Sequence, residues 1–410
     1  MLHWANQYSI FCFLDNHNYQ AGPHSVECLL AAGTKRKFNT KTGYALEGLQ
    51  KFIDEKPAWL FGHLGYDLKN EIENISSHHK DFLGFPECFF FEPEIIISLG
   101  EKEISIECDT DAEKIFEQIM AAGADENIMT AHNYQLQQRF SKTEYLQTIN
   151  NLKNHILRGD CYEINFCHEF FATEAVIDPL TVYAKLSALS PNPFSALYKL
   201  EDKFLICASP ERFLRKEGNK ILSQPIKGTT TRHRQDKVLD EESRHKLFSS
   251  EKDRSENVMV VDLVRNDLSR VCEEGTVQVD ELFGIYSFPQ VHQMISTVSG
   301  DLKKNISFEE IIRATFPMGS MTGAPKKRVM ELVEQYERSR RGIFSGALGY
   351  ITPAGDFDFN VVIRSIMYNG SKKYLSFMAG SGITFYSDAE QEYEECLLKA
   401  EAMKAALKAE

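Results

Sequence analysis

The stretch SKTEYLQTINNLKNHILRGDCYEINF, from Ser141 to Phe166, changes from a helical pattern to a strand pattern. Its first four residues form a capping box, in which a serine and a glutamate three residues later satisfy the first helical N–H groups. Apolar residues then recur at the spacing of one helical face, at Tyr145, Ile149, Leu152 and Ile156. From Cys161 to Phe166 side chains alternate as they do in a strand. The stretch predicts an amphipathic helix that leads directly into a strand.

The same mixture continues on both sides of this stretch. Strands are predicted at 194–200, 204–208, 343–351 and 359–368, and long helices at 235–271 and 388–408. Turns of hairpin length between strands favour antiparallel sheets over a Rossmann arrangement. The predicted fold class is α+β.

The composition of the chain argues against nucleic-acid-binding, membrane and secreted proteins. The chain has 46 Lys plus Arg against 59 Asp plus Glu, a net charge of −13, without the basic patch of a nucleic-acid binder. It has no apolar run of about 20 residues and no secretory signal at its start, so we expect a soluble cytoplasmic protein without nucleic-acid or membrane partners. Its nine cysteines are dispersed without a Cys-x-x-Cys pair, which is typical of reduced cytosolic thiols.

The first third of the chain carries no cluster to which chemistry can be assigned. Residues 121–138 are polar and predict a connection between two bodies. We therefore expect an N-terminal α+β region at 1–130 and a catalytic domain at 141–408.

Lys227 lies in the pentapeptide Pro225-Ile226-Lys227-Gly228-Thr229. A primary amine there could attack a substrate carbon if burial or neighbouring cations lowered its pKa towards neutrality. The alternative is a solvated loop lysine.

Acidic residues gather in two helices. A capping box at 387–390 precedes Glu392, Glu395 and Lys399, whose spacings of three and four place them on one helical face. Two carboxylates and a cation could hold Mg²⁺ and one oxygen of an anionic substrate, although an exposed charged face is the alternative. Glu256 shares a helical face with Asp253 in the second acidic segment.

Two glycine-rich segments could bind anions. Residues 319–326 open a predicted helix whose first N–H groups could face a carboxylate. Residues 379–383, which include Gly380, Ser381 and Gly382, form a small-residue loop that allows close backbone approach, although many such loops are tight turns only.

Taken together, residues 141–404 resemble the chorismate-binding enzymes, a family that includes anthranilate, aminodeoxychorismate, isochorismate and salicylate synthases. The matching segments are Gly159 to Tyr162, Ser209 to Glu211, Pro225 to Thr229, Glu251 to Asn257, Asp262 to Asp267, Phe316 to Lys327, Arg341-Gly342, Ile363-Arg364 and Glu392 to Lys399. The resemblance implies two interlocked subdomains whose antiparallel sheets pack as a sandwich flanked by helices.

The resemblance also implies a site. Glu256 and Glu395 would ligate Mg²⁺, with Glu392 alongside. The carboxylates of chorismate would be held by Thr229, Arg364, Lys399 and the backbone of Gly380, Ser381 and Gly382.

The lysine within the pentapeptide points to one branch of the family. Aminodeoxychorismate synthases carry Lys227's counterpart, whereas anthranilate synthases have alanine there. Isochorismate and salicylate synthases have a water-activating lysine where this chain has Glu163. We therefore expect Lys227 to attack C2 of chorismate while Glu211, assisted by His292, protonates the departing C4 hydroxyl. Ammonia then adds at C4 and expels the lysine.

Two positions depart from the family pattern. Glu163 replaces a common glutamine, and Phe344 replaces a tyrosine that contacts substrate in anthranilate synthases. The Leu-Leu-Glu-Ser segment of tryptophan-inhibited relatives is absent, so no tryptophan inhibition is expected.

No glutaminase motif occurs in the chain, so a separate glutamine amidotransferase is the expected partner and ammonia source. No lyase domain follows the last helix, so the product should keep its enolpyruvyl group and serve as the precursor of para-aminobenzoate and folate. The alternatives are anthranilate synthase component I, a non-catalytic chorismate-binding regulatory subunit, and a lyase that uses water.

Overall fold

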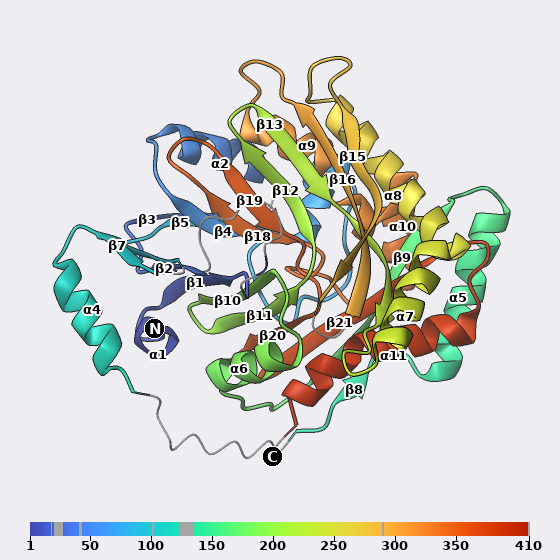
Figure 1. Cartoon of the computed structure of the whole chain (residues 1–410), viewed down its shortest axis with the longest axis horizontal. Coiled ribbons are helices and arrows are strands. Elements are labelled where there is room, and N and C mark those ends of the chain that lie inside the picture. The colour runs from blue at the N-terminus through green and yellow to red at the C-terminus, as the bar shows by residue number, and fades with distance from the viewer. Residues whose placement is uncertain are drawn as a thin grey trace.

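The computed structural model describes residues 1–17, 19, 28–40, 43–100, 102–123, 134–288 and 291–408. Within these residues the chain forms two large sheets surrounded by helices (Figure 1). All the strand pairs between named strands are antiparallel. The predicted α+β class is confirmed.

The first sheet has eleven strands, in the order β17-β9-β21-β20-β11-β10-β1-β2-β6-β7, with β8 beside β9. Their bounds are β1 (Ile10–Asp15), β2 (Cys28–Ala32), β6 (Ile95–Leu99), β7 (Ile104–Cys108), β8 (Gln137–Gln138), β9 (Glu163–Ala172), β10 (Phe194–Leu200), β11 (Lys203–Ser209), β17 (Gly323–Ala324), β20 (Ser365–Asn369) and β21 (Tyr374–Ile383).

The second sheet has ten strands, in the order β14-β16-β13-β12-β19-β18-β4-β5-β3, with β15 beside β16. Their bounds are β3 (Arg36–Thr40), β4 (Leu60–Leu64), β5 (Cys88–Glu92), β12 (Arg212–Glu217), β13 (Lys220–Gln224), β14 (Ile226–Thr231), β15 (Gln278–Ser287), β16 (Val291–Asp301), β18 (Ala347–Ile351) and β19 (Phe357–Asn360).

The helices lie around the two sheets (Figure 1). They are α1 (Leu2–Ala5), α2 (Ala45–Asp54), α3 (Lys69–Glu73), α4 (Ala112–Ala121), α5 (Lys142–Leu157), α6 (Pro179–Leu189), α7 (Lys237–Ser249), α8 (Glu251–Ser269), α9 (Phe308–Thr315), α10 (Lys326–Tyr336) and α11 (Ala389–Ala406), with short 3₁₀ turns η1 (Tyr66–Leu68) and η2 (Gly319–Met321).

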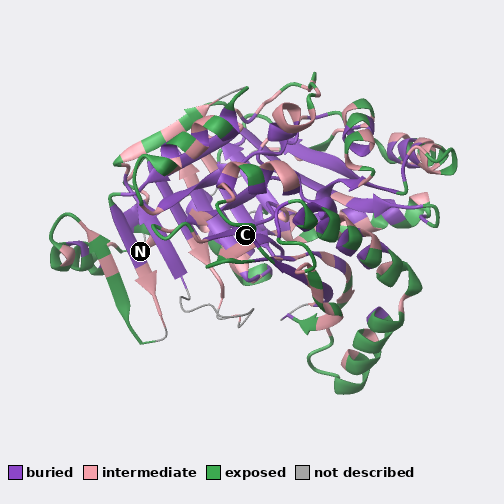
Figure 2. Ribbon diagram, turned by 90° about the horizontal axis from the view of Figure 1, so that it is seen from above, coloured by how far each residue is buried: buried purple, intermediate pink, exposed green. Residues whose placement is uncertain are grey.

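Two apolar cores hold these layers together. Figure 2 shows that buried residues concentrate in the strands. One contains side chains of both sheets, such as Tyr198 of β10 and Phe61 of β4, and therefore fills the sandwich. The other joins the first sheet to helices, with Phe170 of β9 packed in the same cluster as Tyr145 of α5 and Cys396 of α11. Burial of large apolar side chains on both faces of the first sheet is the main stabilising term for this arrangement.

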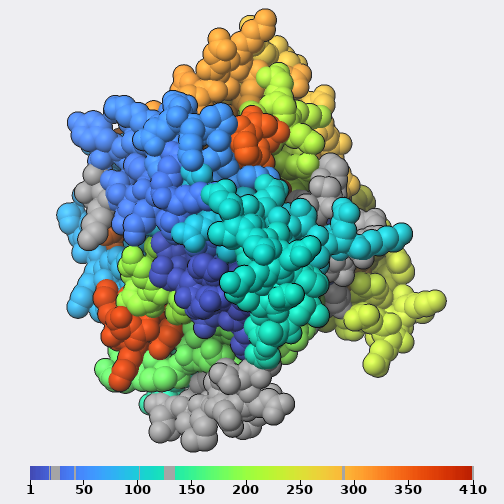
Figure 3. Space-filling view, turned by 90° about the vertical axis from the view of Figure 1, so that its left-hand side faces the viewer, coloured from blue at the N-terminus to red at the C-terminus, as the bar shows by residue number. Residues whose placement is uncertain are grey.

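The N-terminal third is built into both sheets. Strand β1 pairs with β10, and β4 pairs with β18. Figure 3 shows the residues of this third packed against segments from the middle and end of the chain. The predicted boundary near residue 130 lies outside the described residues, and the division into two domains stays a prediction.

Several predicted elements need correction. The single helix expected at 235–271 is two helices, because Ser250 adopts extended backbone and its hydroxyl accepts the N–H of Asp253, which begins α8. The strand expected at 359–368 is two strands, β19 and β20, which belong to different sheets. The strand expected from 343 begins at Ala347.

Other predicted features agree with the structure. The helix after Ser141 is α5, and both hydrogen bonds of its capping box are present. The C-terminal helix is α11, although its cap is the side chain of Asp388 rather than the predicted Ser387. Within the described residues, no helix combines the length and apolar character that a membrane crossing requires.

Candidate active site

Lys227 lies on β14 and reaches across to the first sheet. Its Nζ donates to Oε1 of Glu163 on β9 at 2.5 Å, and the two residues are only 8% and 2% exposed. The pairing of β14 with β16 shifts register between Ile226 and Thr229, and Gly228 has a left-handed φ of 88°. A bulge of this kind re-aims a side chain, which explains why a glycine follows the lysine.

Gly382 on β21 leaves room for this ion pair. A Cβ at that position would lie 2.7 Å from Oε1 of Glu163 and 2.9 Å from Nζ of Lys227. Any larger residue would push the two charged groups apart. The Glu163 side chain keeps its other oxygen, Oε2, buried without a hydrogen-bond partner.

The electrostatic surroundings of Lys227 differ from the expected ones. Burial lowers the pKa of Lys227, but the carboxylates of Glu163, Glu256 and Glu211 outweigh burial and raise the pKa above its ordinary value. The condition stated for a nucleophilic lysine, a lowered pKa, is therefore not met in the free enzyme. The lysine rests as an ammonium because three carboxylates surround it, and it must lose a proton before it can act as a nucleophile.

Glu211 lies immediately before β12 and is buried. Burial raises its pKa to about 7, with the charges of Lys227 and Arg364 acting in the opposite direction. A carboxyl group with this pKa is protonated in part at neutral pH, as a general acid needs to be.

Glu256 and two further carboxylates, Glu392 and Glu395, converge from two helices on Lys252. Lys252 of α8 donates to Oε1 of Glu392 at 3.1 Å, and its Nζ lies 3.8 Å from Glu395 and 3.9 Å from Glu256. Glu395 also pairs with Lys399 at 2.7 Å, and this ion pair, with Lys252 adding to it, lowers the pKa of Glu395. The predicted metal ligands therefore lie together.

The residues fit a hard divalent cation by the chemistry of their donors. Carboxylate oxygens are the ligands that Mg²⁺ prefers. Oε1 of Glu256 and Oε2 of Glu392 are buried without a hydrogen-bond partner. As the described side chains stand, no three ligand-type groups are close enough to bind a metal directly. The ammonium of Lys252 lies among the three carboxylates instead.

The predicted substrate-binding residues flank this cluster. Arg364 is half-buried at a left-handed φ of 50° between β19 and β20, and burial lowers its pKa. Lys399 donates to the carbonyl of Gly380 at 3.0 Å. Thr229 lies on β14 but is exposed.

The segment expected to be a small-residue loop is part of a strand. Gly380, Ser381 and Gly382 pair with β9, while the other neighbour of β21, β20, pairs only as far as Phe377. One side of this backbone therefore lacks a strand partner among the described strands. The hydroxyl of Ser381 is buried without a hydrogen-bond partner.

His292 points to α7. Its Nδ1 lies 2.8 Å from the hydroxyl of Ser287, and its Nε2 lies 3.1 Å from Oδ1 of Asp240. Both ring nitrogens are thus committed within the protein, and the catalytic role of His292 stays a prediction. Phe344 is buried in the sandwich core.

Two contributions were not foreseen from the sequence. Lys252 is one turn before Glu256, and this spacing is the only signal that could have placed it among the carboxylates. Arg341 is 2% exposed and supports β9, the strand that carries Glu163. It donates to the backbone carbonyls of Asn165 and Met321 and pairs with Glu337.

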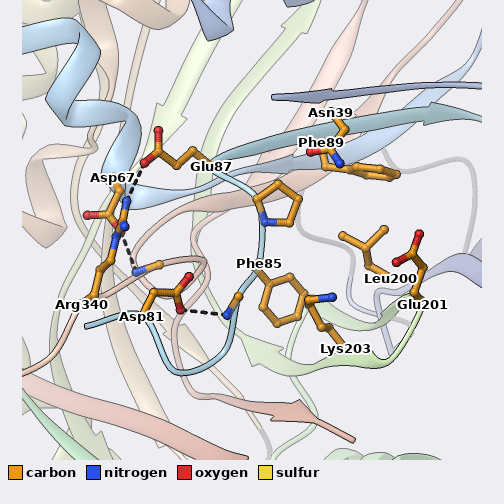
Figure 4. Close-up of a pocket in the computed structure, with 13 residues that line it drawn as sticks. Asn39, Asp67, Asp81, Phe85, Glu87, Phe89, Leu200, Glu201, Lys203 and Arg340 are labelled. Carbon is orange, nitrogen blue, oxygen red and sulfur yellow. Dashed lines mark hydrogen bonds and ion pairs between the residues drawn. The ribbon is translucent and has the colours of Figure 1, made fainter. Parts of the chain in front are cut away.

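A cavity of roughly 460 Å³ lies elsewhere (Figure 4) and contains none of the predicted site residues. Its charged side chains are largely paired already: Arg340 contacts Asp67 at 2.8 Å and Glu87 at 2.5 Å, and Asp81 accepts the N–H of Gly84. The cavity therefore does not compete with the Lys227 cluster as the candidate active site.

The chain is similar to known proteins over most of its length. The family described as chorismate binding enzyme matches residues 15–405. Aminodeoxychorismate synthase component 1 of Salmonella typhimurium is 33% identical over 336 residues, which cover 82% of this chain and 73% of that protein. The probable chloroplastic aminodeoxychorismate synthase of Oryza sativa subsp. japonica is 36% identical over 383 residues, and the match covers 83% of this chain but 42% of that protein.

A solved structure has the same fold. The crystal structure of anthranilate synthase component I from Streptococcus pneumoniae superposes with a TM-score of 0.79 at 26% identity, covering 94% of this chain and 93% of that one. The predicted sandwich of interlocked sheets is thereby confirmed.

Proposed function

Because the chain belongs to the chorismate binding enzyme family, we propose that it converts chorismate and ammonia to 4-amino-4-deoxychorismate, as the aminodeoxychorismate synthases similar to it are named for doing. The observation that carries the proposal is the buried Lys227, which faces Glu163 and is electrostatically coupled to Glu211. A nucleophile and an acid in one buried site suit a substitution at an allylic alcohol.

The reaction proceeds through two displacements. The amine of Lys227, after giving up its proton, forms a bond to C2 of chorismate. Both conjugated ring double bonds shift, from C1=C2 to C1=C6 and from C5=C6 to C4=C5, and the C4–O bond breaks as Glu211 donates its proton to the departing hydroxyl, which leaves as water. Ammonia then bonds to C4, both double bonds shift back, and the C2–N bond to the lysine breaks. The new amino group is thus bound to C4, the carbon that lost the hydroxyl, and the free amine of Lys227 is regenerated.

Glu256 and Glu395 would hold Mg²⁺, with Glu392 beside them. When bound, the ion supplies positive charge that secures a substrate carboxylate. Arg364 and Lys399 provide charged donors for the remaining carboxylate oxygens, and Ser381 offers a buried hydroxyl. Paired charge of this kind is needed to bury a dianion.

Ammonia would come from a separate glutamine amidotransferase subunit. Relatives of this chain are named component 1, which implies a second component. The protein would act in the cytoplasm, and its product would keep the enolpyruvyl group and serve as the precursor of para-aminobenzoate and folate.

The decisive experiment combines the purified chain with chorismate, Mg²⁺ and ammonium at mildly alkaline pH. The product is identified by mass, and released pyruvate is measured. Aminodeoxychorismate without pyruvate is the expected result. Anthranilate with stoichiometric pyruvate would assign the chain to anthranilate synthase component I instead. Turnover without any ammonia source would indicate a water-using enzyme, and chorismate binding without turnover a regulatory subunit.

A further inference from the structure

Lys252 occupies the centre of the predicted metal site. It is on the first turn of α8, and α8 and α11 lie on the same side of the molecule (Figure 1). Its Nζ is within 4 Å of Glu392, Glu395 and Glu256, at 3.1, 3.8 and 3.9 Å. One ammonium thus contacts every carboxylate that is predicted to bind or flank Mg²⁺.

A cation beside these carboxylates lowers the electrostatic cost of keeping them ionised. The Glu256 and Glu392 side chains are 10% and 1% exposed, so water screens them little. Like charges gathered around one ammonium repel one another in a poorly solvated site. In the absence of a metal, Lys252 is the ammonium that all three carboxylates share, while Lys399 also pairs with Glu395.

Lys252 nevertheless satisfies the cluster incompletely. Oε2 of Glu392 and Oε1 of Glu256 are buried without a hydrogen-bond partner. A lysine supplies one charge and three donors, whereas a divalent cation supplies two charges and accepts several oxygens. The site therefore has unused donor oxygens that a metal would employ.

The ammonium of Lys252 can also move out of the cluster. Its side chain is 41% exposed, although its ammonium is engaged. A four-carbon stem with free rotation lets the ammonium move to solvent without displacing the helix backbone.

We propose that Lys252 is a positioning residue that holds the three glutamates together in the metal-free enzyme and gives way when Mg²⁺ enters. The metal therefore competes with a cation that belongs to the protein itself. This inference rests on the proposed Mg²⁺ site.

The test measures Mg²⁺ binding to substrate-free protein by titration calorimetry at pH 8, for the unaltered chain and for Lys252→Met. Removing the competing ammonium should tighten Mg²⁺ binding by about tenfold, which corresponds to roughly 1.4 kcal/mol. Lys252→Arg keeps the competing charge and should bind Mg²⁺ no more tightly than the unaltered chain.

The matched control is Arg265→Met. Arg265 lies on the same helix, is half exposed and pairs with Asp262 of its own helix at 3.2 Å, so the variant loses the same charge away from the cluster. Its Mg²⁺ affinity should equal that of the unaltered chain. Circular dichroism of each variant establishes that it is folded.

The outcomes separate the two proposals. No Mg²⁺ binding to the unaltered chain would overturn the metal site itself. Mg²⁺ binding that is equal or weaker in Lys252→Met would overturn the role of Lys252 and leave the metal site standing. Equal tightening in Arg265→Met would show a general effect of net charge and would likewise overturn the role of Lys252. If Lys252→Met does not fold, Lys252→Gln is measured in its place, with the same expected tightening.

Discussion

A single contact between two residues, Lys227 and Glu163, defines the resting state of the candidate site. The carboxylate holds the lysine as an ammonium at 2.5 Å, in a place where glycine at 382 leaves just enough space. The nucleophile is therefore stored in its unreactive form. Release of its proton is a step that the enzyme must perform on each turnover, and three residue changes test this description.

Glu163→Gln should shift the pH dependence of the reaction. The carboxylate of Glu163 raises the pKa of Lys227, so its removal lowers that pKa and makes the free amine available at lower pH. The rising limb of a kcat–pH profile should move to lower pH. Glu174→Gln, which removes an exposed carboxylate, should leave the profile unchanged. An unmoved limb in Glu163→Gln would mean that Lys227 does not set it.

Lys227→Ala should abolish formation of aminodeoxychorismate. The variant lacks the amine that attacks C2, and its small side chain leaves the acid and the metal ligands in place. The products are separated by chromatography and identified by mass. Continued aminodeoxychorismate formation would refute an obligatory covalent step, whereas a switch to anthranilate would show that the lysine directs ammonia to C4.

Glu211→Gln should lower kcat and reduce the loss of folding stability as the pH rises. The loss of a general acid typically lowers kcat by about 10² to 10⁴. Burial raises the pKa of Glu211 from 4.5 to about 7, so the folded state binds this proton more tightly than the unfolded state. The resulting stability, roughly 3 kcal/mol, is present below pH 4.5 and is lost as the pH rises through about 7.

The glutamine variant does not titrate and should therefore lose less stability between pH 5 and pH 8 than the unaltered protein. Urea unfolding at both pH values measures this difference. Equal pH dependence of the free energy of unfolding in the two proteins would contradict a raised pKa for Glu211.

Residue chemistry was the part of the site most accessible from sequence. The pentapeptide around Lys227 and the glutamates at helical spacing identified side chains that the fold does bring together. The protonation of Lys227 could not be predicted, because it depends on carboxylates from β9, α8 and the segment before β12, which are distant in sequence. The sequence likewise contained no information that His292 faces Asp240 rather than the lysine.

At the scale of elements, the residues of the site lie near points where strands and helices end or where a strand changes its pairing partner. Local signals located such points when they were strong, as with the capping box of α5. They failed where one residue interrupts a continuous pattern. Ser250 divides α7 from α8, and residues 361–364 carry the chain from the second sheet to the first. Hydrophobic periodicity does not reveal this change of sheet, because every residue of β19 and of β20 is buried and the two strands therefore show no difference in pattern.

Gly323→Ala should break one such junction. Gly323 of β17 pairs with Ile164 of β9 at a φ of 147°, and a Cβ there would lie 2.0 Å from the carbonyl oxygen of Glu163. The alanine must displace β17 or β9, at a cost on the order of 2 kcal/mol in stability. Activity should fall as well, because β9 positions Glu163.

Thermal unfolding and kcat together measure this effect. Gly355→Ala provides a control, since Gly355 also has a positive φ of 76° but nothing lies within 4 Å of its added Cβ. Full activity in Gly323→Ala would contradict the requirement for this close strand contact.

At the scale of the whole molecule, the two sheets use strands from both ends of the chain. Strands β1, β2, β6 and β7 complete the first sheet, and β3, β4 and β5 complete the second. The sequence could not predict this interlocking from its own patterns. Pairing between strands that are hundreds of residues apart has no local signature, and it entered the prediction only through family resemblance.

A fragment that begins at residue 134 should therefore not fold. Without the first third, β10 loses β1 and β18 loses β4, so each strand keeps one partner only, and the sandwich core loses the apolar side chains that this third contributes. Gel filtration and near-ultraviolet circular dichroism of the fragment, compared with the full chain, measure the outcome. A monomeric fragment with fixed aromatic signals and cooperative unfolding would show that residues 134–408 form an independent domain.

The pairing of β4 with β18 also affects folding during synthesis on the ribosome. Leu60 meets its partner Ile351 only after about 290 further residues have been added, which takes on the order of 15 to 60 s on a ribosome. Throughout that interval β4, which pairs with the phenylalanine-rich strand β5 on its other side, has an open edge where β18 will pair. The yield of native enzyme in a cell should thus depend on translation speed and on chaperones that shield nascent strands until the last third emerges.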